Sequence, residues 1–121
     1  MGEMKKLIYI DDEEFNLLLF KMSFGNKYNI FTTAFPSEGL EIIKKEKIKV
    51  VITDYKMPLM SGMELINKVK IFQPETICMI LSAYMENDVV TDKTKIFKYI
   101  IKPYKSDKLI DLIEEAFSLV M

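Results

Sequence analysis

Short apolar runs alternate with longer segments of helical periodicity along the chain. Five runs are short and rich in β-branched or aliphatic residues, which is typical of strands. We expect these strands at about 6–10, 29–33, 50–53, 76–81 and 97–101. The run at 50–53 is apolar on both faces, which predicts a central parallel strand covered by helices on either side.

The segments between the strands predict helices. The first covers 13–24 and ends at Gly25-Asn26, as a C-cap pair would end it. Its apolar residues at helical spacing are Phe15, Leu18, Leu19 and Met22. Further helices are expected to begin at Pro36 and to cover 63–72, a short segment at 88–95, and 106–117 with Ser106 as its cap.

Five strand–helix alternations predict an α/β fold, with one doubly wound parallel sheet of five strands and helices on both faces. The expected strand order is 2-1-3-4-5, as in flavodoxin-like folds. A length of 121 residues suits one domain, expected over 1–121, and no linker or internal repeat interrupts the pattern.

The amino-acid composition argues against several classes of function. The chain has no His, which excludes Ser-His-Asp and Cys-His catalysis, and its single Cys78 allows no internal disulfide. The net charge of −1 argues against a broad electrostatic grip on nucleic acid or on a membrane surface. No apolar run is long enough to span a bilayer and the N-terminus is a poor signal peptide, so we expect a cytoplasmic protein.

Polar residues stand directly after four of the predicted strands. Asp11 and Asp12 follow the first, Asp54 the third, Ser82 the fourth and Lys102 the fifth. The carboxyl ends of parallel strands share one edge, where open α/β sheets bind ligands. With order 2-1-3-4-5, the three aspartates meet in one acidic cleft, and the serine and lysine line its far side.

Such a cleft suits a phosphoryl-transfer site. Clustered carboxylates repel one another, and a hard divalent cation such as Mg²⁺ or Mn²⁺ relieves that repulsion. Asp54 stands alone after the most buried strand, so it is the candidate nucleophile that attacks phosphorus and holds the group as an acyl phosphate. The Lys102 ammonium would neutralise phosphoryl oxygens, and the Ser82 hydroxyl could donate a hydrogen bond to one of them.

Four short motifs resemble those of a response-regulator receiver domain of two-component signalling, as in chemotaxis regulators. They occur in order, at 10–13, at 53–58 with Ser61-Gly62, at 81–83 and at 101–104. The resemblance implies that Asp54 accepts a phosphoryl group from the phosphohistidine of a sensor histidine kinase or phosphotransfer protein. It implies a Mg²⁺ ion held by Asp11 (partly through water), Asp12, Asp54 and the backbone carbonyl of Lys56.

The resemblance also implies a conformational switch and not a turnover enzyme. Ser82 and Lys102 hold the phosphoryl group, Tyr99 is the switch aromatic, and the Lys102–Pro103 peptide bond is cis. The output face is formed by 88–95, 97–101 and 106–117, and passes the signal to an output protein or output domain. Ser82 and Lys102 are about two positions closer than the family pattern, so the segment at 88–95 is expected to be short or distorted.

Other interpretations stay open on the sequence. A haloacid-dehalogenase-type phosphohydrolase also uses a strand-end aspartate with Mg²⁺, but position 56 is Lys where that enzyme needs a second acid. The acids at 11–14 could simply favour the start of a helix, and Tyr99 could simply pack in the core. The chain could be a stand-alone phosphorelay protein, or the receiver of a longer transcription factor or output enzyme.

Overall fold

A computed structural model describes residues 3–86, 90 and 92–120 of the chain. The strands are β1 (Lys6–Ile10), β2 (Asn29–Thr33), β3 (Val50–Thr53), β4 (Ile77–Ser82) and β5 (Lys98–Ile101). The helices are α1 (Glu14–Phe24), α2 (Pro36–Glu46), α3 (Gly62–Phe72), the short 3₁₀ helix η2 (Lys93–Lys95) and α4 (Ser106–Val120). All strand pairs are parallel and the order is β2-β1-β3-β4-β5, which confirms the predicted fold.

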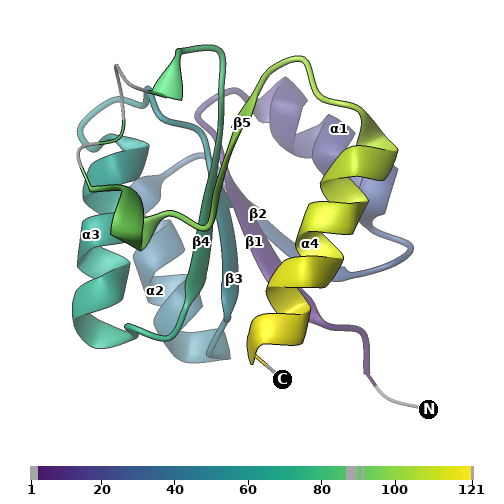
Figure 1. Cartoon of the computed structure of the whole chain (residues 1–121), viewed down its shortest axis with the longest axis horizontal. Coiled ribbons are helices and arrows are strands. Elements are labelled where there is room, and N and C mark those ends of the chain that lie inside the picture. Colours follow the sequence, from purple (N-terminus) through teal and green to yellow (C-terminus); the bar gives the residue numbers. More distant parts are fainter. Residues whose placement is uncertain (1–2, 87–89, 91, 121) are drawn as a thin grey trace.

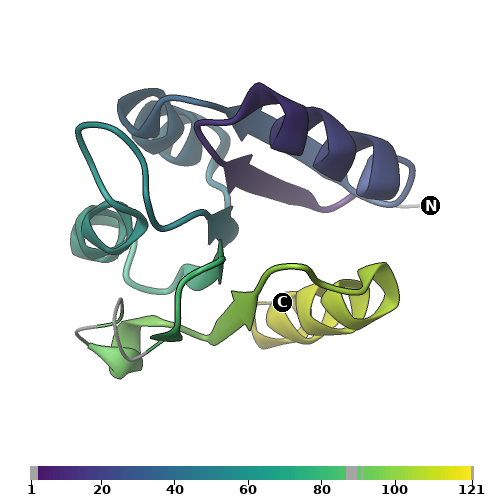
Figure 2. The ribbon, with the colours of Figure 1, turned by 90° about the horizontal axis from the view of Figure 1, so that it is seen from above.

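Helices cover both faces of the twisted sheet. Figures 1 and 2 show α1 and α4 on one face and α2 and α3 on the other. Two apolar clusters fill the space between these layers, one beneath α1 and α4 and one beneath α2 and α3. Every residue of β3 is buried, as its apolar sequence predicted for a central strand.

The apolar residues whose spacing predicted helix α1 are not the residues that it buries. The core-facing residues are Leu17, Phe20 and Phe24. The residues that showed helical spacing in the sequence face solvent, with exposures of 67%, 55%, 43% and 72% for Phe15, Leu18, Leu19 and Met22. The helix is apolar around most of its circumference, so spacing alone does not identify the buried face.

Two details near the C-terminus correct the sequence expectations. The prediction that Ser106 caps the last helix is wrong, because α4 begins at Ser106 and Leu109 N donates to Lys105 O. Residues 88, 89 and 91 lie outside the described residues, and 93–95 form the 3₁₀ helix η2 in place of the predicted α-helical turn. The segment at 88–95 was expected to be short or distorted, and the three-residue helix η2 agrees with that expectation.

One peptide bond and the character of the helices complete the description of the fold. The Lys102–Pro103 peptide bond is cis, as expected. Among the residues that the structure describes, no helix has both the length and the apolar character needed to cross a membrane.

Candidate functional site

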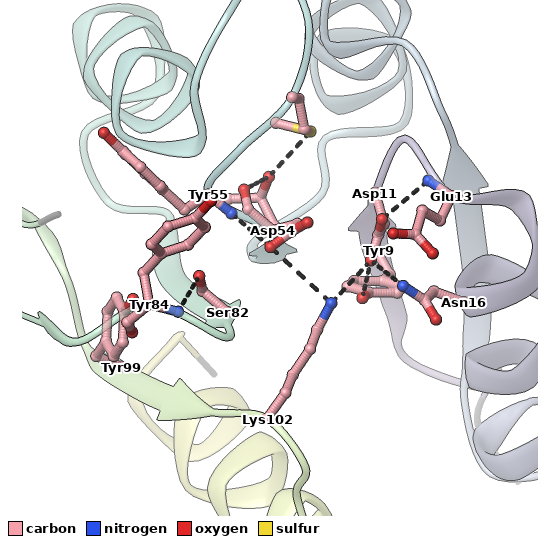
Figure 3. Close-up of polar contacts among 12 residues, drawn as sticks. Tyr9, Asp11, Glu13, Asn16, Asp54, Tyr55, Ser82, Tyr84, Tyr99 and Lys102 are labelled. Atoms are coloured by element: carbon pink, nitrogen blue, oxygen red, sulfur yellow. Dashed lines mark hydrogen bonds and ion pairs between the residues drawn. The ribbon is translucent and has the colours of Figure 1, made fainter.

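Three carboxylates meet at the carboxyl edge of the sheet. Asp11 and Asp12 follow β1, Asp54 follows β3, and these two strands are neighbours. One oxygen of each carboxylate lies within 4.8 Å of the corresponding oxygens of the other two. Lys102 follows β5 and points into the same place, with Nζ 3.2 Å from Asp11 Oδ2 and 3.9 Å from Asp54 Oδ1 (Figure 3). The structure therefore brings these four predicted residues together. We call the three carboxylates the acidic side of the site.

The Asp11 carboxylate is completely buried and fully hydrogen-bonded. Its Oδ1 accepts a hydrogen bond from the backbone N–H of Glu13 at 3.0 Å. Its Oδ2 accepts from three groups: the Tyr9 hydroxyl at 2.6 Å, Asn16 Nδ2 at 3.1 Å and Lys102 Nζ at 3.2 Å (Figure 3). Four donors compensate the loss of hydration that burial imposes on this charge.

Asp54 is less well compensated than Asp11. The pKa of its carboxyl is raised to about 6, mainly by burial and also by the charges of Asp11 and Asp12. The Lys102 ammonium and the hydrogen bond from the backbone N–H of Tyr55, at 2.8 Å, oppose that rise. The side chain keeps 16% of its surface exposed, so an incoming electrophile can reach it. Asp54 thus combines a raised proton affinity with access from solvent.

The loop after Asp54 is fixed close to the site by a glycine and a helix cap. Gly62 N donates to Tyr55 O at 2.7 Å, and a Cβ atom at Gly62 would lie only 2.2 Å from the Asp54 carbonyl oxygen. Only glycine permits this approach. Ser61 and Glu64 form a reciprocal capping box at the start of α3, which anchors the other end of the loop.

Ser82, Tyr84 and Tyr99 form what we call the hydroxyl side of the site. Ser82 ends β4 and is buried, and its Oγ accepts from the backbone N–H of Tyr84 at 3.1 Å. The half-buried Tyr99 donates from its hydroxyl to the Tyr84 carbonyl oxygen at 2.5 Å. Figure 3 shows the three residues together on the opposite flank of Asp54 from Tyr9 and Asp11. Ser82 does not line the open pocket, unlike the predicted Lys102.

An open pocket of about 580 Å³ lies in front of the acidic side. Asp12, Asp54, Lys56 and Lys102 line it, together with the small residue Ala83. The volume accommodates a phosphoryl group with its surrounding water. Lys56 Nζ also lies 5.8 Å from the centre of the Tyr84 ring, a cation–π distance that places its side chain at the rim.

The donor set fits a hard divalent cation. All three clustered side chains offer carboxylate oxygens, the ligands that Mg²⁺ takes in proteins together with several waters. Asp12 is exposed and Asp54 partly so, which leaves room for water ligands. Asp11 already accepts four hydrogen bonds, so its part in ion binding is the most constrained of the three.

Two polar residues of the site were missed by sequence reasoning. Tyr9 and Asn16 both donate to Asp11 Oδ2. A signal for Tyr9 was available, since side chains two residues apart in a strand share a face, and Tyr9 is two residues before Asp11. Asn16 lies in the first turn of α1, and no spacing rule connects it with the end of β1.

Comparison with known proteins identifies the family. The response regulator receiver domain model matches residues 7–114, so the chain belongs to the receiver-domain family. A response regulator receiver domain protein from Clostridium thermocellum is 31% identical, with a TM-score of 0.88 over 98% of this chain and 100% of that chain. The fold and the family predicted from the four motifs are therefore confirmed.

Curated relatives are of two lengths. Sporulation initiation phosphotransferase F of Bacillus subtilis is 25% identical over 118 residues, which cover 95% of each protein. The hydrogenase transcriptional regulatory protein HoxA of Cupriavidus necator is 23% identical over 113 residues, which cover 91% of this chain and 23% of that protein. The chain spans about a quarter of the length of the transcriptional regulators that it matches.

Proposed function

We propose that this chain is a phosphoryl-accepting switch of a two-component system, with Asp54 as the phosphoacceptor. One observation carries the proposal: a partly exposed carboxylate stands beside two others within 4.8 Å, with the Lys102 ammonium 3.9 Å from its Oδ1. Phosphoryl transfer needs mainly positioning and neutralisation of charge, and this arrangement provides both without histidine.

In the proposed step, an Asp54 oxygen forms a bond to phosphorus as the N–P bond of a partner's phosphohistidine breaks. The donor imidazole keeps the electron pair and takes up a proton, and Asp54 becomes an acyl phosphate. Lys102 balances the charge of the phosphoryl oxygens, and Ser82 donates a hydrogen bond to one of them after leaving Tyr84 N.

The acidic side would hold Mg²⁺ during this step. Asp12 and Asp54 would hold it through their side chains and Asp11 partly through water, and the Lys56 carbonyl would be a further ligand. When bound, the ion neutralises the carboxylates and polarises the phosphoryl group. Mn²⁺ offers the same preference for oxygen ligands and would replace it.

The hydroxyl side would convert the new charge into a change of shape. When the Ser82 hydroxyl turns to the phosphoryl group, its bond to Tyr84 N is lost, and Tyr99 leaves the Tyr84 carbonyl and turns inward. This alters the surface made by η2, β5 and α4, where an output protein or output domain would bind. The ligand shifts an equilibrium between two conformations, as in other phosphorylation switches.

The exposed apolar face of α1 is the proposed contact for the phosphohistidine-bearing partner. Phe15, Leu18, Leu19 and Met22 form an exposed stripe, and exposed apolar surface of this kind marks protein interaction sites. Asn16, on the same helix, donates to Asp11 in the site, so a partner on this helix lies close to Asp54. The partner and the switch would both be cytoplasmic.

The protein would promote its own phosphorylation and dephosphorylation without sustained turnover of a substrate. A haloacid-dehalogenase-type hydrolase requires an acid two residues after the nucleophile. Here that residue is Lys56, which lines the pocket.

Intact-mass measurement tests the proposal. The wild type is incubated with Mg²⁺ and a small-molecule phosphodonor, beside an Asp54→Asn variant. We expect the wild type to gain the mass of one phosphoryl group and the variant to gain none. Absence of the adduct across several donors and Mg²⁺ concentrations would refute Asp54 as a phosphoacceptor.

A further inference from the structure

Tyr9 places a hydroxyl beneath the acidic side of the site, from within the apolar core. Its side chain is only 1% exposed, and its ring stacks on Phe20 with centroids 4.4 Å apart. The hydroxyl donates to Asp11 Oδ2 at 2.6 Å (Figure 3). The stacked ring allows the hydroxyl little freedom to move, so this bond has a fixed direction.

The bond from Tyr9 is the shortest of the four that Asp11 accepts. Lys102 and Asn16 reach the same oxygen at 3.2 and 3.1 Å, and Glu13 N reaches the other at 3.0 Å. A carboxylate can only accept, so the Tyr9 hydroxyl is the donor in this pair. Each donor takes up part of the negative charge that Asp11 would otherwise present to a cation.

We propose that Tyr9 is a positioning residue that limits the Mg²⁺ affinity of the acidic side by holding Asp11 Oδ2 toward the core. The proposal rests on the Mg²⁺ site of the proposed function and concerns only how strongly that site binds. A weaker site exchanges its ion more readily, which suits a switch that must be reset.

Removing the hydroxyl should make the cluster more attractive to a cation. In a Tyr9→Phe variant, Asp11 remains buried and accepts one hydrogen bond fewer. Lys102 and any bound ion must then compensate more of its negative charge. Part of the strength of the lost hydrogen bond would pass to the ion, giving roughly three- to tenfold tighter Mg²⁺ binding. The metal-free variant should melt at a lower temperature than the wild type, because its buried charge is less compensated.

Tyr28 provides a matched control. It is a buried tyrosine of the same apolar cluster, 2% exposed, whose ring stacks on Phe117 with centroids 5.7 Å apart. Its hydroxyl donates to the Glu114 carboxylate, on α4 and away from the acidic side. Tyr28→Phe therefore removes the same kind of bond and leaves Asp11 untouched.

The experiment is a calorimetric titration of Mg²⁺ into wild type, Tyr9→Phe and Tyr28→Phe, without any phosphodonor. We expect a lower Kd for Tyr9→Phe and a Kd for Tyr28→Phe within twofold of the wild type. A Tyr9→Phe value equal to or weaker than the wild type overturns the role of Tyr9, as does an equal gain in Tyr28→Phe. If Tyr9→Phe does not fold, the same titration of Tyr9→Met, which also lacks the hydroxyl, decides by the same criterion.

The outcomes separate this inference from the proposed function. A wild type that binds no Mg²⁺ overturns both the Mg²⁺ site and the role of Tyr9. A wild type that binds Mg²⁺ and becomes phosphorylated, with an unchanged Kd in Tyr9→Phe, overturns only the role of Tyr9. Tighter binding in Tyr9→Phe supports that role even where the wild type accepts no phosphoryl group.

Discussion

The acidic side and the hydroxyl side of the site are held in different ways. On the acidic side, Asp11 is buried and accepts four hydrogen bonds, from β1, from α1 and from the loops that follow β1 and β5. On the hydroxyl side, Ser82 accepts one bond from Tyr84 N, and Tyr99 donates one to the Tyr84 carbonyl. Tyr84 is exposed and Tyr99 is half-buried, so little packing opposes a change in these contacts.

This difference indicates that the two sides have separate roles in the proposed switch. Asp11, which accepts hydrogen bonds from four donors, stays in place, and this would preserve the geometry of the proposed ion site beside Asp54. Ser82 and Tyr99 are each held by a single hydrogen bond and can exchange partners at lower cost. The acidic side would therefore receive the phosphoryl group and the hydroxyl side would report it.

The largest expected effect concerns the ion on the acidic side. Ligand at one hundred times its Kd stabilises a folded protein by about 2.7 kcal/mol, and we expect saturating Mg²⁺ to stabilise the wild type to this extent. Asp12→Asn should lose most of that gain, because it removes the most exposed carboxylate of the cluster. Thermal melts with and without Mg²⁺ measure it, and Asp111→Asn on the outside of α4 is the control. An undiminished Mg²⁺ response in Asp12→Asn would contradict its role as a ligand.

A somewhat smaller effect concerns the pH dependence of the metal-free protein. Burial raises the pKa of Asp54 to about 6 from an ordinary value of 3.8, so the folded chain holds this proton more tightly than the unfolded chain. The contribution of Asp54 to the stability of the wild type should therefore fall as pH rises from about 4 to about 6. Asp54→Asn should remove this loss and raise the free energy of unfolding at pH 7 by about 2 kcal/mol. Urea unfolding of both proteins at pH 4 and pH 7 measures the difference, and an equal offset at the two pH values would contradict it.

An intermediate effect tests how the partner reaches the acidic side. Phe15→Ala truncates the exposed stripe of α1 and leaves the core intact. Loss of one well-placed contact costs more than about 1 kcal/mol, so phosphotransfer from a histidine kinase should slow about tenfold. Labelling by a small phosphodonor should be unchanged, because it needs no docking surface. The control is Ile71→Ala, which truncates another exposed apolar residue, on α3. A similar loss in both variants would argue against α1 as the contact.

The smallest effect belongs to the hydroxyl side. Tyr99→Phe removes one hydrogen bond to the carbonyl oxygen of an exposed residue, so the free energy of unfolding should change by less than about 1 kcal/mol. Tyr9→Phe removes a bond to a buried charge and should cost more, about 1–3 kcal/mol. Chemical denaturation of the metal-free variants compares them directly. Equal costs would remove the contrast between the two sides.

Strands and site positions could be predicted because they depend on local patterns. The strands at 6–10, 29–33 and 50–53 agree with the structure, since buried parallel strands are continuous apolar runs. Asp54 and Lys102 were predictable because a residue directly after a parallel strand lies at a known edge. The sheet order then brings β1 beside β3 and their acids together.

The remaining features depend on tertiary contacts. The exposed face of α1 could not be predicted from the sequence, because the neighbours Leu17 and Leu18 are equally apolar. Only packing against the sheet decides that Leu17 is buried and Leu18 exposed. The orientation of Ser82 depends on a hydrogen bond with the loop that follows it. The donors to Asp11 come from β1, α1 and the residue after β5, and their convergence is a property of the fold.

Reductive trapping of the acyl phosphate tests the central claim most directly. Borohydride converts an aspartyl phosphate to homoserine, and peptide mass spectrometry then locates the altered residue. After incubation with Mg²⁺ and a phosphohistidine donor, we expect homoserine at position 54 and unmodified aspartate at positions 11 and 12. Homoserine at another position, or a phosphoryl group on a serine or threonine that survives borohydride, would contradict Asp54 as the acceptor.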